Sequence, residues 1–483
     1  MTTAVIDEQR ETLIVAGDGA RPAGAVLDGP RARVAARVTG AGKTWKATFP
    51  LRVARFGGAV LPLPSGEYAL RVEGADLSGL HVERQVLPGL GIEIDGDTVR
   101  IDPPLDAVYL TPEGQITLEE RYVAQPGGTE NAVFFESFYG QSAGCNPRAI
   151  DRELAARAPG VRRYWSVVDL SIPVPEGAIA LVEGSPEWWR ARGAARLLVV
   201  NDWLRRRFAR KNGPGDRVQR VLQTWHGTPL KRLALHRPGF DPRRMAAVVK
   251  ESRRWDVLLA QNRYSERILT RAYAFFGKPV WVDGYPRNDV LVNGDGAAVR
   301  AALGIRPEER VLLYAPTWRD DRAEIVDFID PERLAQETDA VVLVRGHSRT
   351  LRPGRDQEGA RVIDVTGYPQ TAELLLAADG LITDYSSVMF DFSVTGKPMY
   401  FLVPDLEHYR GRLRGFYFDL AARAPGPLVR TPEELTAALA DDTLAGAYAD
   451  RYAAWRAQFN GHDDGRAAER VVTRILDLGF VDA

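Results

Sequence analysis

One histidine in the sequence lies in a setting that suits proton transfer. Residues 224 to 231 read Thr-Trp-His-Gly-Thr-Pro-Leu-Lys, and this segment comes shortly after the apolar pair Val221 and Leu222. If the apolar run is a buried strand, His226 emerges at its carboxyl end, which is where open α/β sheets bind ligands. Imidazole titrates near neutral pH, so a histidine at that position can accept a proton from an attacking hydroxyl. A lone histidine in such a turn can equally serve only to hydrogen-bond the backbone. The other loops of the sequence are needed to distinguish this structural role from proton transfer.

Four further polar clusters follow apolar runs downstream. They read Gly-Tyr-Pro-Arg-Asn-Asp from Gly284, Ala-Pro-Thr-Trp-Arg-Asp from Ala315, Arg-Gly-His-Ser-Arg from Arg345 and Asp-Tyr-Ser-Ser from Asp384. The clusters supply small residues together with a hydroxyl, an arginine or a histidine. Because the carboxyl ends of parallel strands meet along one edge of a sheet, five such endings favour binding sites over five unrelated surface loops.

The cluster that begins at Asp384 suits a phosphate group. Ser386 and Ser387 open a predicted helix, and free N–H groups with hydroxyls at a helix start favour anions. Ser387 and Asp391 are four residues apart and therefore share one face of that helix. The same residues also make an ordinary helix N-cap, and Arg345 with His347 also fits an exposed polar pair, so both alternatives stay open.

From residue 131 onward, strand-like and helix-like segments alternate. Helical patterns such as Gln370–Ala378 and Ser386–Thr395 separate most of the strand-like runs, which predicts parallel sheets with helices on both faces. The ten runs are Ala132–Phe135, Arg196–Val200, Arg220–Thr224, Val257–Ala260, Val280–Asp283, Val311–Tyr314, Val341–Val344, Val362–Val365, Gly380–Thr383 and Met399–Val403. Ten strands are too many for one nucleotide-binding unit and fit two, so we expect α/β units at residues 131–290 and 291–483. The final helical stretches, Ala447–Phe459 and Arg466–Leu478, are expected to pack back across both units.

Residues 1–130 have a different rhythm. Short alternating segments, among them Ala32–Val38, Glu67–Val72 and Ile92–Ile94, are separated by Gly, Pro and Asp turns, which predicts an antiparallel β-domain of sandwich type. Asp95-Gly96-Asp97 formally spells the Asp-x-Asp pattern of metal–nucleotide sites. It lies between two strand-like segments, however, and we interpret it as a hairpin turn.

The composition is that of an ordinary globular protein, with 483 residues of which 45% are apolar and 26% charged. The single cysteine, Cys145, excludes an intrachain disulfide and a cysteine-rich zinc site. The sequence shows no P-loop, no credible dinucleotide-binding glycine pattern and no histidine pair for a metal, so we predict no metal-binding residues. No signal peptide or bilayer-length apolar run is recognisable, which predicts a cytoplasmic protein.

Positive charge is concentrated in one segment. Residues 188–254 contain 18 Lys or Arg against four Asp or Glu, although the whole chain carries a formal net charge of −1. Within this segment a helix-like stretch combines basic residues with Trp203 and Phe208, a mixture typical of a helix on anionic lipid. The basic residues assigned to this surface are Arg205, Arg206, Arg207, Arg210 and Lys211 of this stretch, together with Lys231, which follows His226. A plain solvated helix explains such a run as well, and no nucleic-acid-binding module accompanies it.

Taken in order, the motifs resemble the CDP-glycerol glycerophosphotransferase family. The resemblance rests on the five clusters above, on Phe390-Asp391-Phe392 and Gly396-Lys397-Pro398, and on three further segments: Phe135-Glu-Ser-Phe-Tyr-Gly140, Asn146-Pro147 and Asp464-Gly-Arg-Ala-Ala-Glu-Arg470. It covers roughly residues 132 to 478 and leaves the N-terminal β-domain without an implied role.

The resemblance implies a GT-B-like fold, with two Rossmann-like domains facing a cleft, acceptor domain first and CDP-donor domain second. It implies transfer of glycerol phosphate, or a related alditol phosphate, from CDP-glycerol to a hydroxyl of a polymer or lipid-linked acceptor. CMP would be released, and the product would be a teichoic-acid-like or capsular polymer. The enzyme would work peripherally on the inner face of the cell membrane, with no cofactor beyond its substrate, CDP-glycerol or CDP-ribitol.

The implied catalytic residues are His226, as general base on the acceptor hydroxyl, and His347, which stabilises the diphosphate. The implied donor-binding residues are Thr317, Arg319, Arg345, Asp384, Ser386, Ser387 and Asp391. Among these, Asp384 would position the loop, and Asp391 would orient it or meet sugar or alditol hydroxyls.

Two other classes of protein stay open. One is a GT-B glycosyltransferase that uses a nucleotide sugar for cell-surface polysaccharide. The other is a polymer-binding protein built on an inactive transferase, against which the presence of both His226 and His347 argues. The sequence separates neither glycerol from ribitol donors nor a primase from a polymerase.

Overall fold

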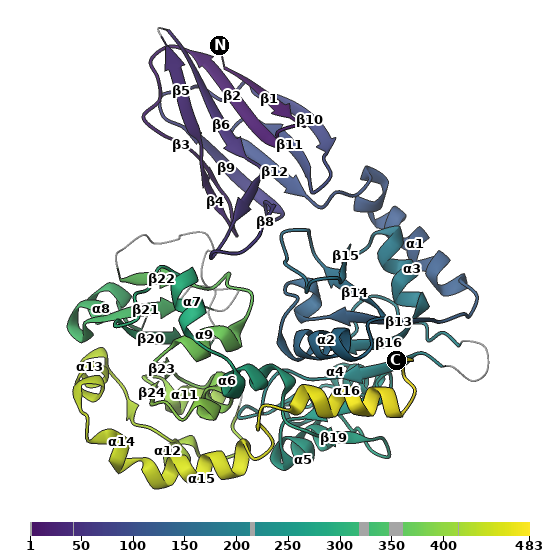
Figure 1. Cartoon of the computed structure of the whole chain (residues 1–483), viewed down its shortest axis with the longest axis vertical. Helices are drawn as coiled ribbons and strands as arrows, with labels where there is room; N and C mark the ends of the chain where they lie inside the picture. Colours follow the sequence, from purple (N-terminus) through teal and green to yellow (C-terminus); the bar gives the residue numbers. More distant parts are fainter. Residues whose placement is uncertain (1, 42, 213–217, 318–327, 347–360, 414) are drawn as a thin grey trace.

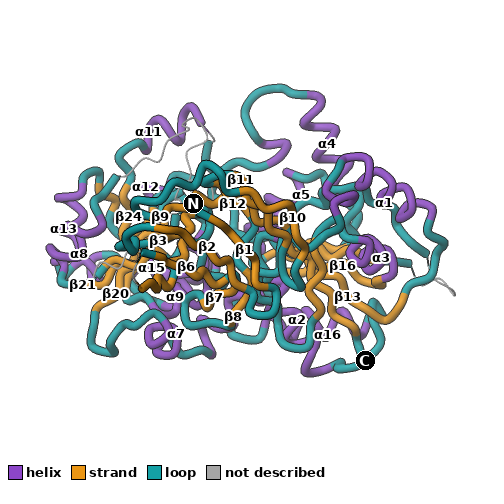
Figure 2. The backbone as a smooth tube through the Cα atoms, turned by 90° about the horizontal axis from the view of Figure 1, so that it is seen from above, coloured by secondary structure: helices purple, strands orange, loops and turns teal. Residues whose placement is uncertain are grey.

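The computed structural model describes residues 2–41, 43–212, 218–317, 328–346, 361–413 and 415–483. It contains an antiparallel β-region at the N-terminus and two α/β halves, each built on one parallel sheet (Figure 1). The predicted α/β class and the predicted N-terminal β-region both agree with this arrangement. Seen from above, the N-terminal strands lie over the middle of the molecule with an α/β half on either side (Figure 2).

The N-terminal region is a sandwich of two antiparallel sheets with strand orders β1-β2-β6-β5 and β10-β11-β12-β9-β3-β4. Alternate side chains point between the sheets, and the shared core includes Leu13, Phe49 and Ile92. The strands are β1 Thr3–Asp7, β2 Thr12–Asp18, β3 Ala25–Asp28, β4 Arg33–Ala35, β5 Arg37–Ala41, β6 Thr44–Pro50, β9 Gly66–Val72, β10 His81–Val86, β11 Gly91–Asp95 and β12 Thr98–Asp102. A separate hairpin, β7 Arg52–Ala54 with β8 Val60–Pro62, projects from the sandwich (Figure 1).

The predicted turn at Asp95-Gly96-Asp97 is confirmed. Strands β11 and β12 form a hairpin in which Asp95 pairs with Thr98, and Gly96 has a φ of +60°, which glycine adopts without strain. The predicted run Ala32–Val38, in contrast, is divided between β4 and β5, which belong to different sheets.

The first α/β half carries a seven-stranded parallel sheet of order β15-β14-β13-β16-β17-β18-β19. Its strands are β13 Glu130–Glu136, β14 Arg162–Val167, β15 Ile179–Val182, β16 Ala195–Val200, β17 Arg220–Gln223, β18 Val257–Ala260 and β19 Val280–Val282. Helices α1 Pro112–Ala124, α3 Pro186–Ala194, α4 Pro242–Ser252 and α5 Arg263–Ala272 share a core with one face of the sheet. Helices α2 Cys145–Arg157 and α16 Ala467–Asp477 share a core with the other face.

The second half carries a six-stranded parallel sheet of order β22-β21-β20-β23-β24-β25. Its strands are β20 Arg310–Ala315, β21 Ala340–Val344, β22 Val362–Asp364, β23 Gly380–Thr383, β24 Met399–Leu402 and β25 Leu428–Val429. Helices α8 Pro331–Thr338 and α13 Pro432–Ala440 pack on one face. Helices α7 Ala297–Ala302, α9 Thr371–Ala377, α10 Val388–Phe392 and α15 Ala449–Phe459 pack on the other.

All ten predicted strands of the α/β halves are present, with ends that differ by at most two residues. Strands β14, β15 and β25, which lie toward the sheet edges, were not predicted from the sequence. The predicted helix Ser386–Thr395 is shorter: α10 spans five residues and a 3-10 turn, Ser393–Thr395, follows. As predicted, the final helices return across both halves, α15 to the second and α16 to the first.

Candidate active site

His226 lies in the loop after β17, with its imidazole half-buried between aromatic rings. The ring of Trp225 stacks on it at a centroid distance of 4.8 Å, and Phe138 meets it edge-on at 5.5 Å. Nδ1 lies 2.5 Å from the carbonyl oxygen of Asn201. Because a carbonyl only accepts hydrogen bonds, Nδ1 carries the proton and the lone pair of the neutral ring is on Nε2. This tautomer is the one that a general base needs.

The backbone around His226 is held from outside its own loop. The side-chain amide of Asn146, at the start of α2, donates to the carbonyl oxygens of Thr224 and Trp225, each at 3.2 Å. The guanidinium of Arg287 donates to the carbonyl oxygen of His226 at 2.9 Å. Trp225 itself has a φ of +54°, a left-handed conformation that such contacts have to stabilise. Asn146 and Arg287 lie in motifs that carried the family resemblance, but neither of them was assigned a role from the sequence.

Gly227, directly after the histidine, brings this loop against the loop after β23, Asp384–Ser387, which we call the serine loop. A Cβ atom at Gly227 would lie 2.7 Å from Oγ of Ser387 and 3.0 Å from its Cβ. A side chain at residue 227 would therefore push the two loops apart. The close approach places His226 and Ser387 at one site, although they belong to different sheets.

Arg287 and Asp391 join the two halves beside this contact. Nη2 of Arg287 donates to Oδ2 of Asp391 at 2.6 Å, and the amide of Asn288 donates to Oδ1 at 3.0 Å. Burial raises the pKa of Asp391, and Arg287 and Asn288 only partly offset this effect. Both carboxylate oxygens of Asp391 thus bind the segment after β19, and the role of Asp391 toward the donor stays a prediction from the sequence.

Asp384 ties together the loops that follow β20 and β23. The backbone N–H of Thr317 donates to its two carboxylate oxygens at 2.9 and 3.1 Å, and the N–H of Tyr385 donates to Oδ1 at 2.5 Å. The carboxylate is buried, so these bonds are shielded from water. Ser386 and Ser387 follow as half-buried residues, and Oγ of Ser386 accepts a long 3.4 Å bond from the N–H of Val388. Asp384 therefore shapes the serine loop from within.

Arg345, after β21, is anchored by the segment that follows β22. Nη1 donates to the carbonyl oxygens of Val365 and Tyr368 at 2.9 and 3.0 Å. Burial lowers the pKa of Arg345 to about 10. Two other predicted residues of this half, His347 and Arg319, lie outside the described residues.

The structure corrects the prediction for Lys211 and for the helix that was to carry these basic residues. Residues 203–211, all of which the structure describes, form a loop and not a helix. Lys211 is buried, and its ammonium group donates to the carbonyl oxygens of Tyr122, Val123 and Gln125 at 2.6, 3.2 and 3.0 Å. Arg210 pairs with Asp256 at 2.6 Å. Lys211 therefore stabilises the first half internally, whereas Arg210 is held by Asp256 and also lines the basic cavity described below.

The other basic residues are more accessible. Arg205, Arg206 and Arg207 are exposed, and the first two pair with Glu183 at 3.7 and 2.8 Å. Arg205 also covers the ring of Tyr139, with its Cζ 4.0 Å from the ring centroid. Lys231 is half-buried, with its ammonium group 5.9 Å from the ring of Tyr409 in the second half.

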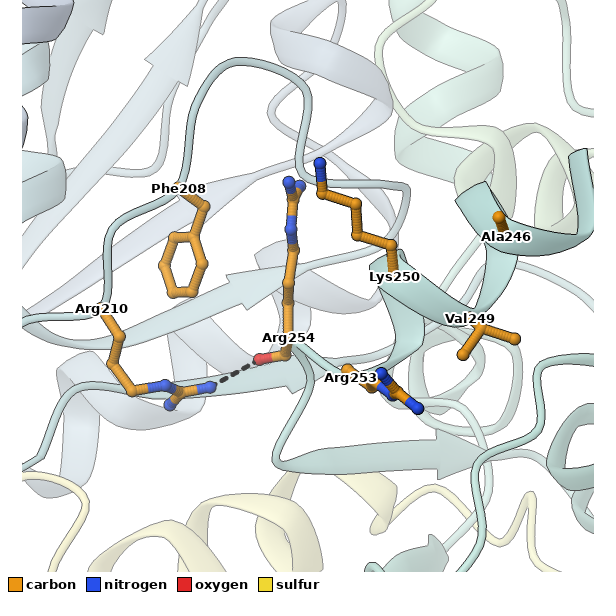
Figure 3. A pocket seen from close by; sticks show the side chains of 7 residues that line it. All are labelled: Phe208, Arg210, Ala246, Val249, Lys250, Arg253 and Arg254. Atoms are coloured by element: carbon orange, nitrogen blue, oxygen red, sulfur yellow. Dashed lines mark hydrogen bonds between the residues drawn. The ribbon is translucent and has the colours of Figure 1, made fainter. Parts of the chain in front are cut away.

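A basic cavity of about 600 Å³ lies between this loop and α4 (Figure 3). Its lining consists of Phe208, Arg210, Ala246, Val249, Lys250, Arg253 and Arg254. The apolar and cationic lining suits an amphiphilic anion. The lining residues in α4 and directly after it were not predicted as individual candidates. The basic ones among them do lie in the segment 188–254, whose excess of positive charge the sequence shows. None of the helices in the part of the chain that the structure describes has the length and apolar composition of a membrane span.

Each α/β half has a parallel sheet, and the His226 loop of one half meets the serine loop of the other. This arrangement is suited to group transfer between two substrates. Residues 120–477 match the family described as CDP-glycerol:poly(glycerophosphate) glycerophosphotransferase. The chain belongs to this family, and the resemblance inferred from the motifs is confirmed. The match begins at residue 120, so the β-sandwich lies outside it.

Two similar proteins are named for roles in teichoic acid synthesis, in agreement with the family match. The chain is 38% identical to the teichoic acid poly(glycerol phosphate) polymerase of Bacillus subtilis (strain 168), over 71% of this chain and 48% of that protein. It is 32% identical to the teichoic acid glycerol-phosphate transferase of Staphylococcus aureus, over 72% of this chain and 93% of that protein. It thus spans about half the length of the first relative and matches nearly all of the second.

The same relationship holds for solved structures. The wall teichoic acid polymerase TagF superimposes with a TM-score of 0.68 at 31% identity, covering 75% of this chain and 93% of TagF. TagF variants in which a histidine is replaced by alanine or by asparagine have been solved, and the asparagine variant was also soaked with CDPG.

Proposed function

We propose that this protein transfers glycerol phosphate, or a related alditol phosphate, from CDP-glycerol to a hydroxyl of a polymer or lipid-linked acceptor in teichoic-acid-like polymer synthesis. The observation that carries the proposal is the contact of Gly227 with Ser387. The proposal is supported because His226, whose Nδ1 bonds the Asn201 carbonyl, precedes Gly227, and because the hydroxyls of the adjoining loop suit a phosphate. Family membership supplies the donor, and the named relatives supply the kind of polymer.

In this reaction the acceptor oxygen attacks the phosphorus that carries glycerol. A new oxygen–phosphorus bond forms, and the bond from that phosphorus to the bridging oxygen of the diphosphate breaks, so that CMP leaves with the bonding electrons. His226 takes the hydroxyl proton on Nε2, and the Asn201 carbonyl stabilises the resulting imidazolium through Nδ1. Charge on the phosphate oxygens needs donors that are already in place, because reorganising them would cost free energy during the reaction.

The donor side is assigned to the second half. Ser386 and Ser387 would hold the phosphate on a loop that Asp384 shapes, and Arg345 would add positive charge from β21. His347 and Arg319 remain assigned to the diphosphate as predictions from the sequence. No resident metal or cofactor is included in this proposal. Turnover that survives treatment with a chelator would support that part, and turnover that stops would overturn it.

The proposed arrangement is GT-B-like, with the acceptor in the first half and the donor in the second. Strands β17 and β23 belong to separate parallel sheets, and the loops after them touch. Ligands of such sheets bind at the carboxyl ends of strands, which is where both loops lie. The substrates would therefore meet between the halves.

For the acceptor side we retain an anionic membrane surface, with a reduced set of residues. Arg205, Arg206 and Arg207 are exposed, and the cavity of Figure 3 adds Lys250 and Arg253. Since exposed charges are screened over about 8 Å at physiological salt, binding to anionic vesicles should weaken as salt is added. Vesicle binding that ignores salt, or its absence at low salt, would remove this part of the proposal.

The direct test offers purified protein CDP-glycerol, CDP-ribitol and UDP-sugars with a synthetic lipid-linked acceptor. CMP release with CDP-glycerol and growth of the acceptor by glycerol phosphate are expected. UDP release with a sugar would instead identify a glycosyltransferase of similar fold. The length of the product distinguishes a primase from a polymerase.

A further inference from the structure

The N-terminal β-region lies beside both α/β halves (Figure 1) and contacts each of them through side chains. Its contact with the first half centres on Asp169, which follows β14. The N–H of Ser65 donates to Oδ2 of Asp169 at 2.9 Å, and Arg31 forms an ion pair with the same oxygen. Asp169 is 2% exposed and also accepts a bond from the N–H of Ser171 at 3.0 Å. A buried carboxylate that accepts this many hydrogen bonds holds the sandwich in a fixed position against the first half.

Its contact with the second half is made by the turn between β7 and β8. The ring of Phe56 meets Tyr368 edge-on at a centroid distance of 5.5 Å, and Phe56 packs against the core of the second half. Gly57 lies so close to α7 that a Cβ atom there would be 3.2 Å from Cβ of Ala302. A Cβ at Gly367 would clash with the guanidinium of Arg55. The turn is therefore fitted closely to its partner surface.

Phe56 adopts this contact at a conformational cost. Its φ is +50°, in the left-handed region that residues with a side chain rarely occupy. Such a conformation persists only where surrounding contacts over-determine it. The contact of Phe56 with Tyr368 thus indicates a specific docking of the turn.

Each of the two contacts lies next to a segment of the proposed site. Tyr368 supplies one of the carbonyl oxygens that anchor Arg345, at 3.0 Å. On the other side, Val168, the neighbour of Asp169, donates its N–H to the carbonyl oxygen of Gly140 at 3.0 Å. Gly140 belongs to the same short turn as Phe138, whose ring meets His226. The sandwich therefore connects, by short paths, to both sides of the site.

We propose that the N-terminal β-sandwich is a brace that fixes the two halves relative to each other, and that Phe56 is a positioning residue for the donor through Tyr368 and Arg345. Nothing in the family match covers this role, because the match begins beyond the sandwich. The role of Phe56 toward the donor rests on the proposed function, whereas the brace role of the sandwich rests on its contacts alone.

The experiment compares the full-length protein with Phe56→Ala, Phe56→Leu and the control Phe276→Ala. Phe276 is 66% exposed, so its truncation removes the same atoms without a docking contact. Hydrogen–deuterium exchange is followed on a peptide spanning residues 362–370, where the amide of Tyr368 bonds the carbonyl of Val365. The affinity for CDP-glycerol is measured by calorimetry, and kcat and KM are measured on the lipid-linked acceptor.

For Phe56→Ala we expect exchange in this peptide to quicken about tenfold, which is the scale for losing a packed aromatic pair. The Kd and KM for CDP-glycerol should rise by a similar factor, with kcat within about twofold of wild type. Phe56→Leu should recover most of both effects, and Phe276→Ala should match wild type.

The failures are distinguishable. Exchange in Phe56→Ala that equals the Phe276→Ala control would overturn the brace, whatever the activity. Faster exchange with unchanged CDP-glycerol affinity, in a protein that turns CDP-glycerol over, would overturn the positioning role of Phe56. A wild-type protein that does not turn CDP-glycerol over would refute the proposed function and with it the donor role, while the exchange comparison would still decide the brace.

Discussion

Arg287 of the first half and Asp391 of the second form an ion pair of 2.6 Å, with side chains only 14% and 8% exposed. The same guanidinium donates to the carbonyl oxygen of His226. One arginine thus connects the joint between the halves to the backbone of the proposed general base.

Asp391→Ala should therefore lower the free energy of unfolding by about 3 kcal/mol, because it leaves a buried guanidinium without its counter-charge. Denaturant unfolding followed by circular dichroism measures the change. Glu469→Ala removes the partner of Arg466 from an exposed pair and should leave the unfolding curve unchanged. Equal unfolding curves for Asp391→Ala and wild type would show that the pair does not hold the halves together.

The contact of Gly227 with Ser387 makes a steric prediction. Gly227→Ala should destabilise the protein by about 1–3 kcal/mol, the usual cost of forcing a methyl group into a filled space. Ser387→Gly in the same chain should recover most of that loss, since it removes the atoms that the new Cβ meets. A double-mutant cycle of unfolding free energies gives the coupling. Additive effects of the two substitutions would mean that the loops do not touch.

The hydroxyls of Ser386 and Ser387 are expected to serve the donor more than the acceptor. Ser386→Ala and Ser387→Ala should each weaken binding of CDP-glycerol about fivefold to tenfold, the equivalent of one neutral hydrogen bond of about 1 kcal/mol. Calorimetry with CDP-glycerol and with CMP measures this directly. If neither variant loses affinity, the phosphate binds elsewhere.

Much of the α/β framework could be predicted from the sequence, because its central strands are continuous apolar runs that end in turn residues. Strand β14 was missed since Arg162 and Arg163 open it, and their charges conceal the buried residues that follow. The stretch 203–211 was mistaken for a helix because charged and aromatic residues alternate there as they do on an interfacial helix. In the structure Lys211 is instead bound by carbonyl oxygens of α1 and the residue after it, a long-range contact that no local pattern contains.

The candidate site was predictable as a set of loops but not as a set of contacts. His226 and Ser387 could be named because each follows an apolar run. That Arg287 would bond both the His226 carbonyl and Asp391 depends on two sheets meeting, which residue spacing does not encode. The docking of Phe56 on Tyr368 was equally beyond reach, because these residues are more than three hundred positions apart.

Asp463 should make stability depend on pH. Burial raises the pKa of this carboxyl to about 6, although Gln261, Asn460 and Tyr285 donate hydrogen bonds to it. The folded protein therefore holds the proton more tightly than the unfolded chain, so ionisation destabilises the fold as pH rises from about 4 to about 6. The stability of wild type relative to Asp463→Asn should fall by about 3 kcal/mol between pH 4 and pH 7, since two pKa units correspond to roughly that amount. A difference that stays constant over this range would contradict the assigned pKa.

In the proposed reaction, His226 removes the proton from an acceptor hydroxyl that attacks CDP-glycerol. The most direct measurement is single-turnover release of CMP from CDP-glycerol on a lipid-linked acceptor, with wild type and His226→Ala compared at saturating donor. We expect the variant to fold, to bind CDP-glycerol as wild type does and to release CMP at least about a hundredfold more slowly. CMP release at the wild-type rate from His226→Ala would contradict it.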